Sequence, residues 1–125
     1  MKKKKFLAAI VQMKSSINKQ DNLIESLKYI KEAAERQADY IFFPEFQMAF
    51  SSNTQTLDEL YKTAETLPDS KFIKRICHYS KKYKIGIVGT FFEKNPYKNS
   101  FILFIRIFFK ECTYYSYLIF FRIVT

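Results

Sequence analysis

Residues 40–46, Tyr-Ile-Phe-Phe-Pro-Glu-Phe, form a short apolar run that ends at a proline followed by a single carboxylate. The run is rich in β-branched and aromatic side chains, which predicts a buried strand, and Pro44 ends its hydrogen-bonding ladder because proline has no N–H. Glu45 should then lie at the strand end between Phe43 and Phe46, where desolvation disfavours the charged carboxylate. A carboxylate in such a place is a candidate general base. The alternative is a strand-end glutamate that faces solvent or caps a turn.

The size and charge of the chain indicate one domain, or part of one, with 125 residues and a mass of 15.0 kDa. A formal net charge of +9 would suit a nucleic-acid partner. However, the lysines are scattered along the chain, and the only dense block is residues 2–5. We expect that block to be a solvated tail, and we expect no nucleic-acid partner.

The N-terminal apolar run, residues 6–11, is too short for a signal peptide because the polar residues Gln12 and Lys14 interrupt it. Cys77 and Cys112, in a chain without a secretory pattern, do not suggest a disulfide framework. We therefore expect a cytoplasmic protein.

Nothing in the residue pattern indicates a metal or a cofactor. His78 is the only histidine, and it lies beside Cys77 within a helical pattern, so both are expected to be structural. The only glycines are Gly86 and Gly89, which excludes a glycine-rich phosphate loop.

The apolar pattern predicts four strands and three helices. A helix over residues 19–38, capped by Asn18, joins a strand at 6–13 to the strand at 40–45, which makes a parallel βαβ unit. Its apolar positions at helical spacing are Leu23, Ile24, Leu27, Ile30, Ala34 and Ala38.

The second part of the chain continues this alternation. The pattern predicts a helix within 56–66, a helix at 69–83 capped by Asp69 or Ser70, a strand at 85–92, a turn at 93–99 and a strand at 100–105.

Several of these segments, taken in order, resemble the N-terminal half of the nitrilase superfamily of carbon–nitrogen hydrolases. They are Phe-Leu-Ala-Ala-Ile-Val-Gln-Met at 6–13, the helix at 22–39, Ala-Asp-Tyr-Ile-Phe-Phe-Pro-Glu at 38–45, Ile-Val-Gly-Thr at 87–90 and Lys-Asn-Ser at 98–100. The resemblance covers roughly residues 6–104.

This resemblance implies an α/β fold, a partial α-β-β-α sandwich of nitrilase type. One mainly parallel sheet should carry the helices near 19–38 and 69–83 on one face, and the other face should be uncovered because the C-terminal half is missing. It also implies Glu-Lys-Cys chemistry on a small amide, nitrile or carbamoyl amine, with Glu45 as the general base. A carboxylate can take the thiol proton, and a lysine can offset the developing oxyanion.

The lysine and cysteine of that triad are not recognisable in the chain. Lys110 lacks both the motif and the spacing of the family lysine, and Cys112 follows it too soon and has no acidic residue after it. Neither residue is assigned a catalytic role, so we expect these 125 residues to be truncated before the triad is complete and inactive alone.

The last segment of the chain changes character. Nine of the 25 residues at 101–125 are Phe or Tyr, and none is Gly, Pro, Asn or Asp, although turns need such residues. We predict an N-terminal hydrolase region at 1–105 and an aberrant aromatic tail at 106–125, as a disrupted reading frame would produce. A membrane span is less favoured, because charged residues interrupt the apolar run.

The sequence leaves two other functions open. The half-fold could be a non-catalytic interaction protein or subunit, and a homo-oligomer is not excluded. An unrelated flavodoxin-like domain is less favoured, because residues 14–18 contain no glycine for close approach to a phosphate.

Overall fold

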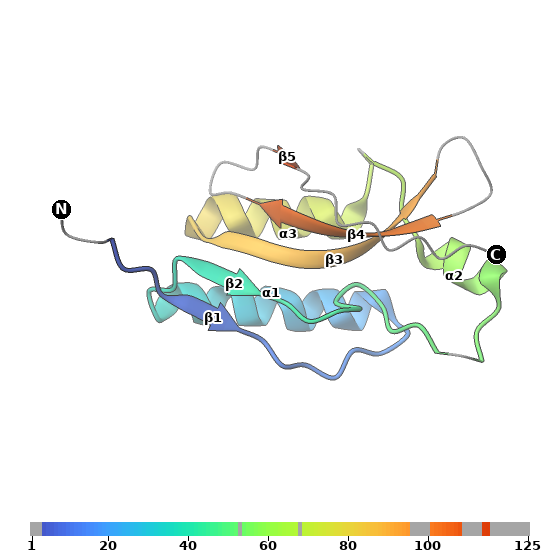
Figure 1. The fold of residues 1–125 in the computed structure, drawn as a ribbon, viewed down its shortest axis with the longest axis horizontal. Helices are drawn as coiled ribbons and strands as arrows, with labels where there is room; N and C mark the ends of the chain where they lie inside the picture. The colour runs from blue at the N-terminus through green and yellow to red at the C-terminus, as the bar shows by residue number, and fades with distance from the viewer. Residues whose placement is uncertain (1–3, 53, 68, 96–100, 109–113, 116–125) are drawn as a thin grey trace.

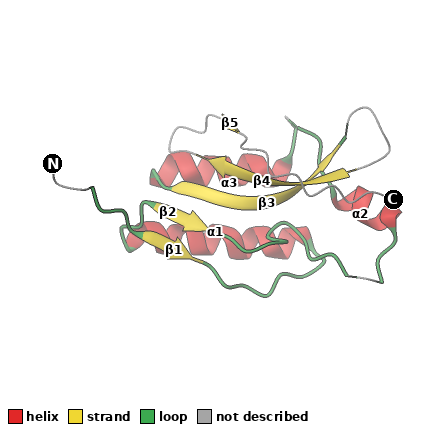
Figure 2. Cartoon of the chain, viewed as in Figure 1, coloured by secondary structure: helices red, strands yellow, loops and turns green. Residues whose placement is uncertain are grey.

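The computed structural model describes residues 4–52, 54–67 and 69–95 and, as strands, 101–108 and 114–115. The described elements, in chain order, are β1 (Ala8–Ile10), α1 (Lys19–Glu35), β2 (Tyr40–Phe42), α2 (Leu57–Thr63), α3 (Lys71–Tyr83), β3 (Gly86–Lys94), β4 (Phe101–Phe108) and β5 (Tyr114–Tyr115). Figure 2 shows where the helices, strands and loops lie in the structure.

The strands form one sheet in the order β1-β2-β3-β4-β5. β1, β2 and β3 are parallel, with Ile41 in register between Ala9 and Ile87. β4 runs antiparallel to β3, from Ile87 opposite Phe108 to Lys94 opposite Phe101, and β5 runs antiparallel to β4. The parallel part is thus the predicted βαβ arrangement, extended by a hairpin.

One face of the sheet carries the helices and the core. Figure 1 shows α1 behind β1 and β2, and α3 behind β3. The Phe72 ring of α3 packs edge-on against Phe91 of β3, with centroids 5.8 Å apart. The largest fully buried aliphatic side chains are Ile30, Ile41, Met48, Ile73, Ile76, Ile85 and Ile87. The predicted placement of both long helices on one face is therefore confirmed.

The opposite face is open at β1 and β2. Ile10 is 85% exposed and Phe42 is 40% exposed, whereas their strand neighbours Val11 and Ile41 are buried. This alternation follows from the two-residue period of a strand. The prediction of an uncovered apolar face is confirmed at these two positions. It is wrong at β3, where Thr90 and Phe92 lie on the same face as Phe42 and are buried.

β1 and β2 are shorter than the predicted 6–13 and 40–45. Hydrogen bonding continues one residue past each strand, because Val11 N–H donates to Phe42 O and Phe43 N–H donates to Val88 O, both at 2.9 Å. Pro44 then has no N–H to offer, and the chain leaves the sheet.

The buried face of α1 differs from the prediction. Ile24 is 58% exposed, and the polar residues Asn22 and Ser26 are buried instead. The side chains of Asn22 and Ser26 reach neighbouring loops, so the hydrogen bonds that they make turn this part of the helix towards the loops.

α1 ends three residues before the predicted Ala38 because Gln37 adopts a left-handed conformation, with φ of 62°. Gln37 N–H donates to Ala34 O at 2.9 Å, and Ala38 N–H donates to Ala33 O at 3.0 Å. This pair of hydrogen bonds is a Schellman motif, in which glycine is the preferred residue at the left-handed position.

Gln37→Gly is therefore expected to stabilise the protein by about 1 kcal/mol, because it removes the Cβ that disfavours a left-handed backbone. Urea unfolding followed by circular dichroism would measure the change. Lys28→Gly, at an exposed position inside α1, should instead cost about 1 kcal/mol. If both substitutions destabilised the protein equally, the role assigned to Gln37 would be wrong.

The predicted caps are confirmed. Asn18 Oδ1 accepts from the backbone N–H of Gln20 and Asp21, and Ser70 rather than Asp69 caps α3 by accepting from Ile73 N–H. The short helix α2 begins with a capping box between Thr56 and Glu59.

Cys77 is buried in α3, as expected of a small core residue. Its sulfur is in a disulfide bond, which corrects the expectation drawn from cysteine spacing alone. Disulfide pairing depends on the spatial approach of two Cβ atoms, which sequence spacing does not reveal.

β3 and β4 are longer than predicted. β3 runs to Lys94, and β4 runs to Phe108, three residues past the predicted end at Ile105. Residues 96–99 of the turn predicted at 93–99, and the first residue of the strand predicted at 100–105, lie outside the described residues. The interpretation of 106–125 as an aberrant tail stays a prediction.

Candidate functional site

Glu45 lies in a turn three residues beyond the end of β2, at the carboxyl end of the parallel strands. This placement agrees with the sequence-based expectation, but the expected burial is wrong, because Glu45 is exposed. Among the described residues it has no ion-pair or hydrogen-bond partner for its side chain.

The aromatic neighbours of Glu45 pack away from it. Phe43 is buried in the core, and Phe46 has a left-handed backbone with φ of 62°. The Phe46 ring stacks on Phe92 at 6.2 Å and meets Phe50 edge-on at 5.8 Å. A positive φ is unfavourable for a bulky residue, so ring packing holds a strained turn. The strained turn leaves the Glu45 carboxylate facing outward.

α1 holds the segment after Glu45 from the helix side of the sheet. Gln47 is fully buried, and its Nε2 donates to Ser26 Oγ at 3.1 Å. Asn22 Nδ2 donates to Met48 O at 3.0 Å and to Ser16 O at 2.7 Å, while Asn22 Oδ1 accepts from Ser16 N–H at 2.9 Å. Asn22 is 2% exposed, so it joins the β1–α1 loop to the β2–α2 loop inside the protein.

β3 supports the same turn from the other side. Thr90 Oγ1 donates to Pro44 O at 3.3 Å, and Phe92 N–H donates to Met48 Sδ at 3.3 Å. Gly89 leaves room here, because a Cβ at this position would overlap the side-chain oxygen of Gln47 and lie 2.7 Å from the Phe91 ring. The turn that carries Glu45 is thus fixed by α1 and β3 together.

Sequence reasoning missed Asn22, Ser26 and Gln47. Asn22 and Ser26 are four residues apart and share a face of the helix with apolar residues. Polar residues on an otherwise apolar helix face were the signal that could have revealed a buried contact.

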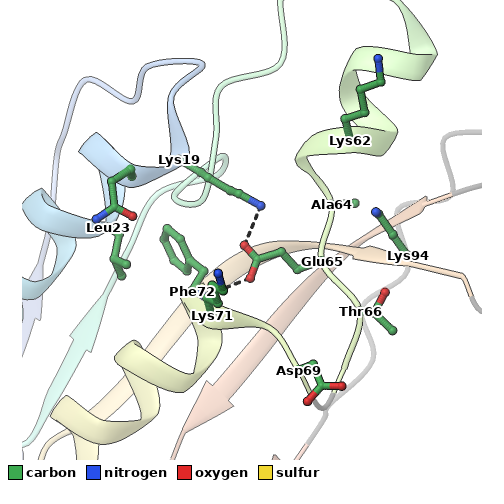
Figure 3. Close-up of a pocket in the computed structure, with 11 residues that line it drawn as sticks. Lys19, Leu23, Lys62, Ala64, Glu65, Thr66, Asp69, Lys71, Phe72 and Lys94 are labelled. Atoms are coloured by element: carbon green, nitrogen blue, oxygen red, sulfur yellow. Dashed lines mark hydrogen bonds and ion pairs between the residues drawn. The ribbon is translucent and has the colours of Figure 1, made fainter.

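A pocket opens on the helix side of the structure, with a volume of about 460 Å³. Figure 3 shows Lys19 reaching from α1 towards Glu65, which lies between α2 and α3. Lys19 Nζ lies 2.7 Å from Glu65 Oε2 and also donates to Thr63 O at 3.0 Å. Glu65 Oε1 accepts from Ser70 Oγ at 2.9 Å and from Phe72 N–H at 3.0 Å.

The backbone of Glu65 pairs with the edge of β3, beyond the part of β3 that pairs with β2. Glu65 N–H donates to Phe92 O at 3.0 Å, and Lys94 N–H donates to Glu65 O at 2.9 Å. Glu65 therefore joins the sheet, the start of α3 and the start of α1.

The pKa of Glu65 lies below its ordinary value of 4.5. Burial by itself raises this pKa, but the Lys19 hydrogen bond and charge, together with the donors Phe72 N–H and Ser70 Oγ, outweigh the burial effect. The carboxylate is thus held in its charged form.

Glu65 is accordingly expected to make stability depend on pH on the acid side. Its pKa is lower in the folded than in the unfolded state. The contribution of Glu65 to the free energy of unfolding is therefore complete at pH values above its ordinary pKa, and it is lost as the pH falls through the folded-state pKa. The difference in unfolding free energy between the wild type and Glu65→Gln should be constant near neutrality. It should shrink in acid by at most about 1.4 kcal/mol per pH unit.

Urea unfolding at several pH values would measure this difference. The matched control is Glu35→Gln, whose carboxylate is 63% exposed and lies 3.9 Å from Lys31, a pair that should contribute little. If the difference in unfolding free energy from the wild type varied with pH no more for Glu65→Gln than for Glu35→Gln, the proposed stabilisation of the charged Glu65 carboxylate would be wrong.

Across residues 4–52, 54–67 and 69–95, no group of three or more His, Cys, Asp or Glu side chains is arranged to hold a metal ion. Lys110 and Cys112 lie outside the described residues. In the described part of the chain, no helix combines the length and apolar character needed to cross a bilayer.

The sequence model of the carbon-nitrogen hydrolase family matches residues 7–119. No curated protein sequence matches the chain closely enough to count as a relative.

The structure is similar to three solved proteins, each over most of this chain. The Caenorhabditis elegans NitFhit protein has a TM-score of 0.78 at 18% identity, covering 96% of this chain and 29% of its own. Saccharomyces cerevisiae Nit3, a member of branch 10 of the nitrilase superfamily, has a TM-score of 0.73 at 24% identity, covering 86% of this chain and 41% of its own. An amidase from Nesterenkonia sp. has a TM-score of 0.63 at 12% identity, covering 87% of this chain and 40% of its own.

These 125 residues thus span less than half the length of each of those three proteins. Because the family match extends over most of the sequence and the fold agrees with it, the chain belongs to the carbon-nitrogen hydrolase family and has the fold of the nitrilase superfamily.

Proposed function

We propose that this chain is the N-terminal part of a hydrolase that cleaves a non-peptide carbon–nitrogen bond in an amide, nitrile or carbamoyl amine. Glu45 is its general base. The observation that carries the proposal is the position of Glu45, on a turn fixed by α1 and β3 at the carboxyl end of β2, in a chain that matches the family over residues 7–119. One of the similar structures is an amidase, which supports the bond type.

In the proposed cycle, the Glu45 carboxylate takes the proton of a cysteine thiol, and the thiolate attacks the carbon of the substrate. The nitrogen leaves as ammonia or an amine, and the same carboxylate then activates the water that releases the acid. A lysine ammonium stabilises the negative charge on the substrate oxygen or nitrogen. We propose that the cysteine and the lysine lie outside these 125 residues and that the exposed Glu45 is covered when they are present.

The test is ammonia release by a longer chain. The coding sequence downstream is read in all three frames, and a chain that restores the missing segments is expressed with Glu45 and with Glu45→Gln. Activity that depends on Glu45 supports the proposal. Equal activity of the two longer chains would exclude Glu45 as the base.

The second candidate function is a non-catalytic subunit, and the exposure of Ile10 and Phe42 on the open sheet face favours it. A subunit of this kind would associate through that face with a second protein. Light scattering of the purified chain and of Ile10→Ser would separate the two cases. A subunit should lose its association in the variant, whereas association that Ile10→Ser leaves unchanged would count against this candidate.

A further inference from the structure

The pocket beside Glu65 is rich in positive charge. Four lysines and two carboxylates line it: Lys19, Lys62, Lys71, Lys94, Glu65 and Asp69. No arginine is among the lining residues. The formal charge of this lining is +2, and Figure 3 shows that its members come from both helix starts, from α2 and from β3.

The two carboxylates are already engaged. Glu65 is paired with Lys19 at 2.7 Å, and Asp69, just before α3, lies 3.4 Å from Lys74 in the first turn of that helix. Among the described residues, Lys62, Lys71 and Lys94 have no carboxylate within 4 Å. Three of the four lining lysines therefore form no ion pair with another described residue, and the lining keeps its formal charge of +2.

Of these three lysines, Lys94 makes a contact with an aromatic ring. It is half-buried, and its Nζ lies 4.9 Å from the centre of the Tyr61 ring. This cation–π contact restricts the flexible side chain at the pocket wall, which lowers the entropy lost when a ligand binds.

The backbone adds to the positive potential. Lys19 is the first residue of α1, with 17 residues, and Lys71 is the first residue of α3, with 13 residues. Both helix dipoles thus direct their positive ends towards the pocket. Glu65 shows that this place stabilises an oxyanion, because its carboxylate accepts from Lys19, Ser70 and Phe72 N–H together.

We propose that this pocket binds the phosphate group of a small molecule through Lys62, Lys71 and Lys94. A lysine ammonium is a point charge that binds phosphate groups in many proteins. The volume of about 460 Å³ lies in the range of small-molecule sites. The proposal does not depend on Glu45 or on hydrolase activity.

The test is an NMR titration of the full chain with inorganic phosphate at constant ionic strength. Amide shifts should saturate in the millimolar range and centre on Lys71 and Lys94. Lys71→Gln/Lys94→Gln removes two charge-assisted hydrogen bonds and should weaken the affinity at least about tenfold, which corresponds to roughly 1.4 kcal/mol. Lys28→Gln/Lys81→Gln removes the same charge from exposed positions elsewhere on α1 and α3 and should leave the affinity unchanged.

Three results would overturn the proposal. Phosphate shifts could fail to saturate, both double variants could lose affinity equally, or acetate could bind as tightly as phosphate. The first result would show that no specific site exists, and the second that only the net charge of the protein matters. The third would show that the pocket does not select phosphate over a carboxylate. If the Lys71→Gln/Lys94→Gln spectrum lost its dispersion, each single substitution would be compared with Lys81→Gln in the same way.

Discussion

Purified residues 1–125 are expected to release no ammonia from amides, nitriles or carbamoyl compounds. A general base without its nucleophile has no route to an acyl-enzyme, and loss of a catalytic nucleophile lowers the rate by about 10⁶ in serine proteases. Glu45 is exposed, and its side chain has no partner among the described residues. A coupled assay for ammonia with a panel of the three substrate classes would check this expectation.

The longer chain that restores the lysine and cysteine segments should recover turnover. In that chain Glu45→Gln is expected to lower kcat at least about 10³-fold, because glutamine keeps the shape of the side chain but takes up no proton. Glu25→Gln, at an exposed position of α1, is the matched control and should leave kcat unchanged. Turnover by residues 1–125 that disappeared in Glu45→Gln would contradict the expectation.

Asn22→Leu is expected to lower the free energy of unfolding by about 3 kcal/mol or more. The substitution keeps roughly the same shape but leaves two backbone groups without a partner, Ser16 N–H and Met48 O. It also removes one of the two hydrogen bonds that Ser16 O accepts, the other coming from Phe50 N–H. Each unpaired buried group costs about 1–3 kcal/mol. Urea unfolding would measure the loss.

Hydrogen exchange would show where the Asn22→Leu change acts. The amide of Phe50 donates to Ser16 O at 2.8 Å, so it should lose protection before the amides of α3 do. Gln20→Leu, exposed on α1, is the control and should change stability by less than about 0.5 kcal/mol. A loss under about 1 kcal/mol for Asn22→Leu, with Phe50 still protected, would show that Asn22 does not hold the Glu45 loop.

Local signals were sufficient for the order of elements and for the helix starts. Asn18 and Ser70 cap their helices through bonds to backbone groups two or three residues away, so a short stretch of sequence contains the whole interaction. The strand that begins at Tyr40, predicted over 40–45, and the break in its ladder at Pro44 follow from apolar composition and a missing N–H, which are also local properties.

The face of α1 was less predictable, because periodicity assumes that the buried face is apolar. Asn22 and Ser26 are buried since each finds a partner in a loop, and those partners are 26 and 21 residues further along the chain. A helix in isolation would have placed Ile24 in the core, and the contacts with distant loops expose it instead.

The amino-acid sequence by itself determined the βαβ order, the caps and the placement of a single carboxylate after β2. Only the tertiary structure decided that Glu45 is exposed, that Phe46 is left-handed and that Lys19 meets Glu65. The physical reason is the range of the interactions: propensity, capping and proline chemistry act within a few residues. The contacts that shape the site join Thr90 to Pro44 across 46 positions and Lys19 to Thr63 across 44, so they exist only once the sheet and helices have assembled.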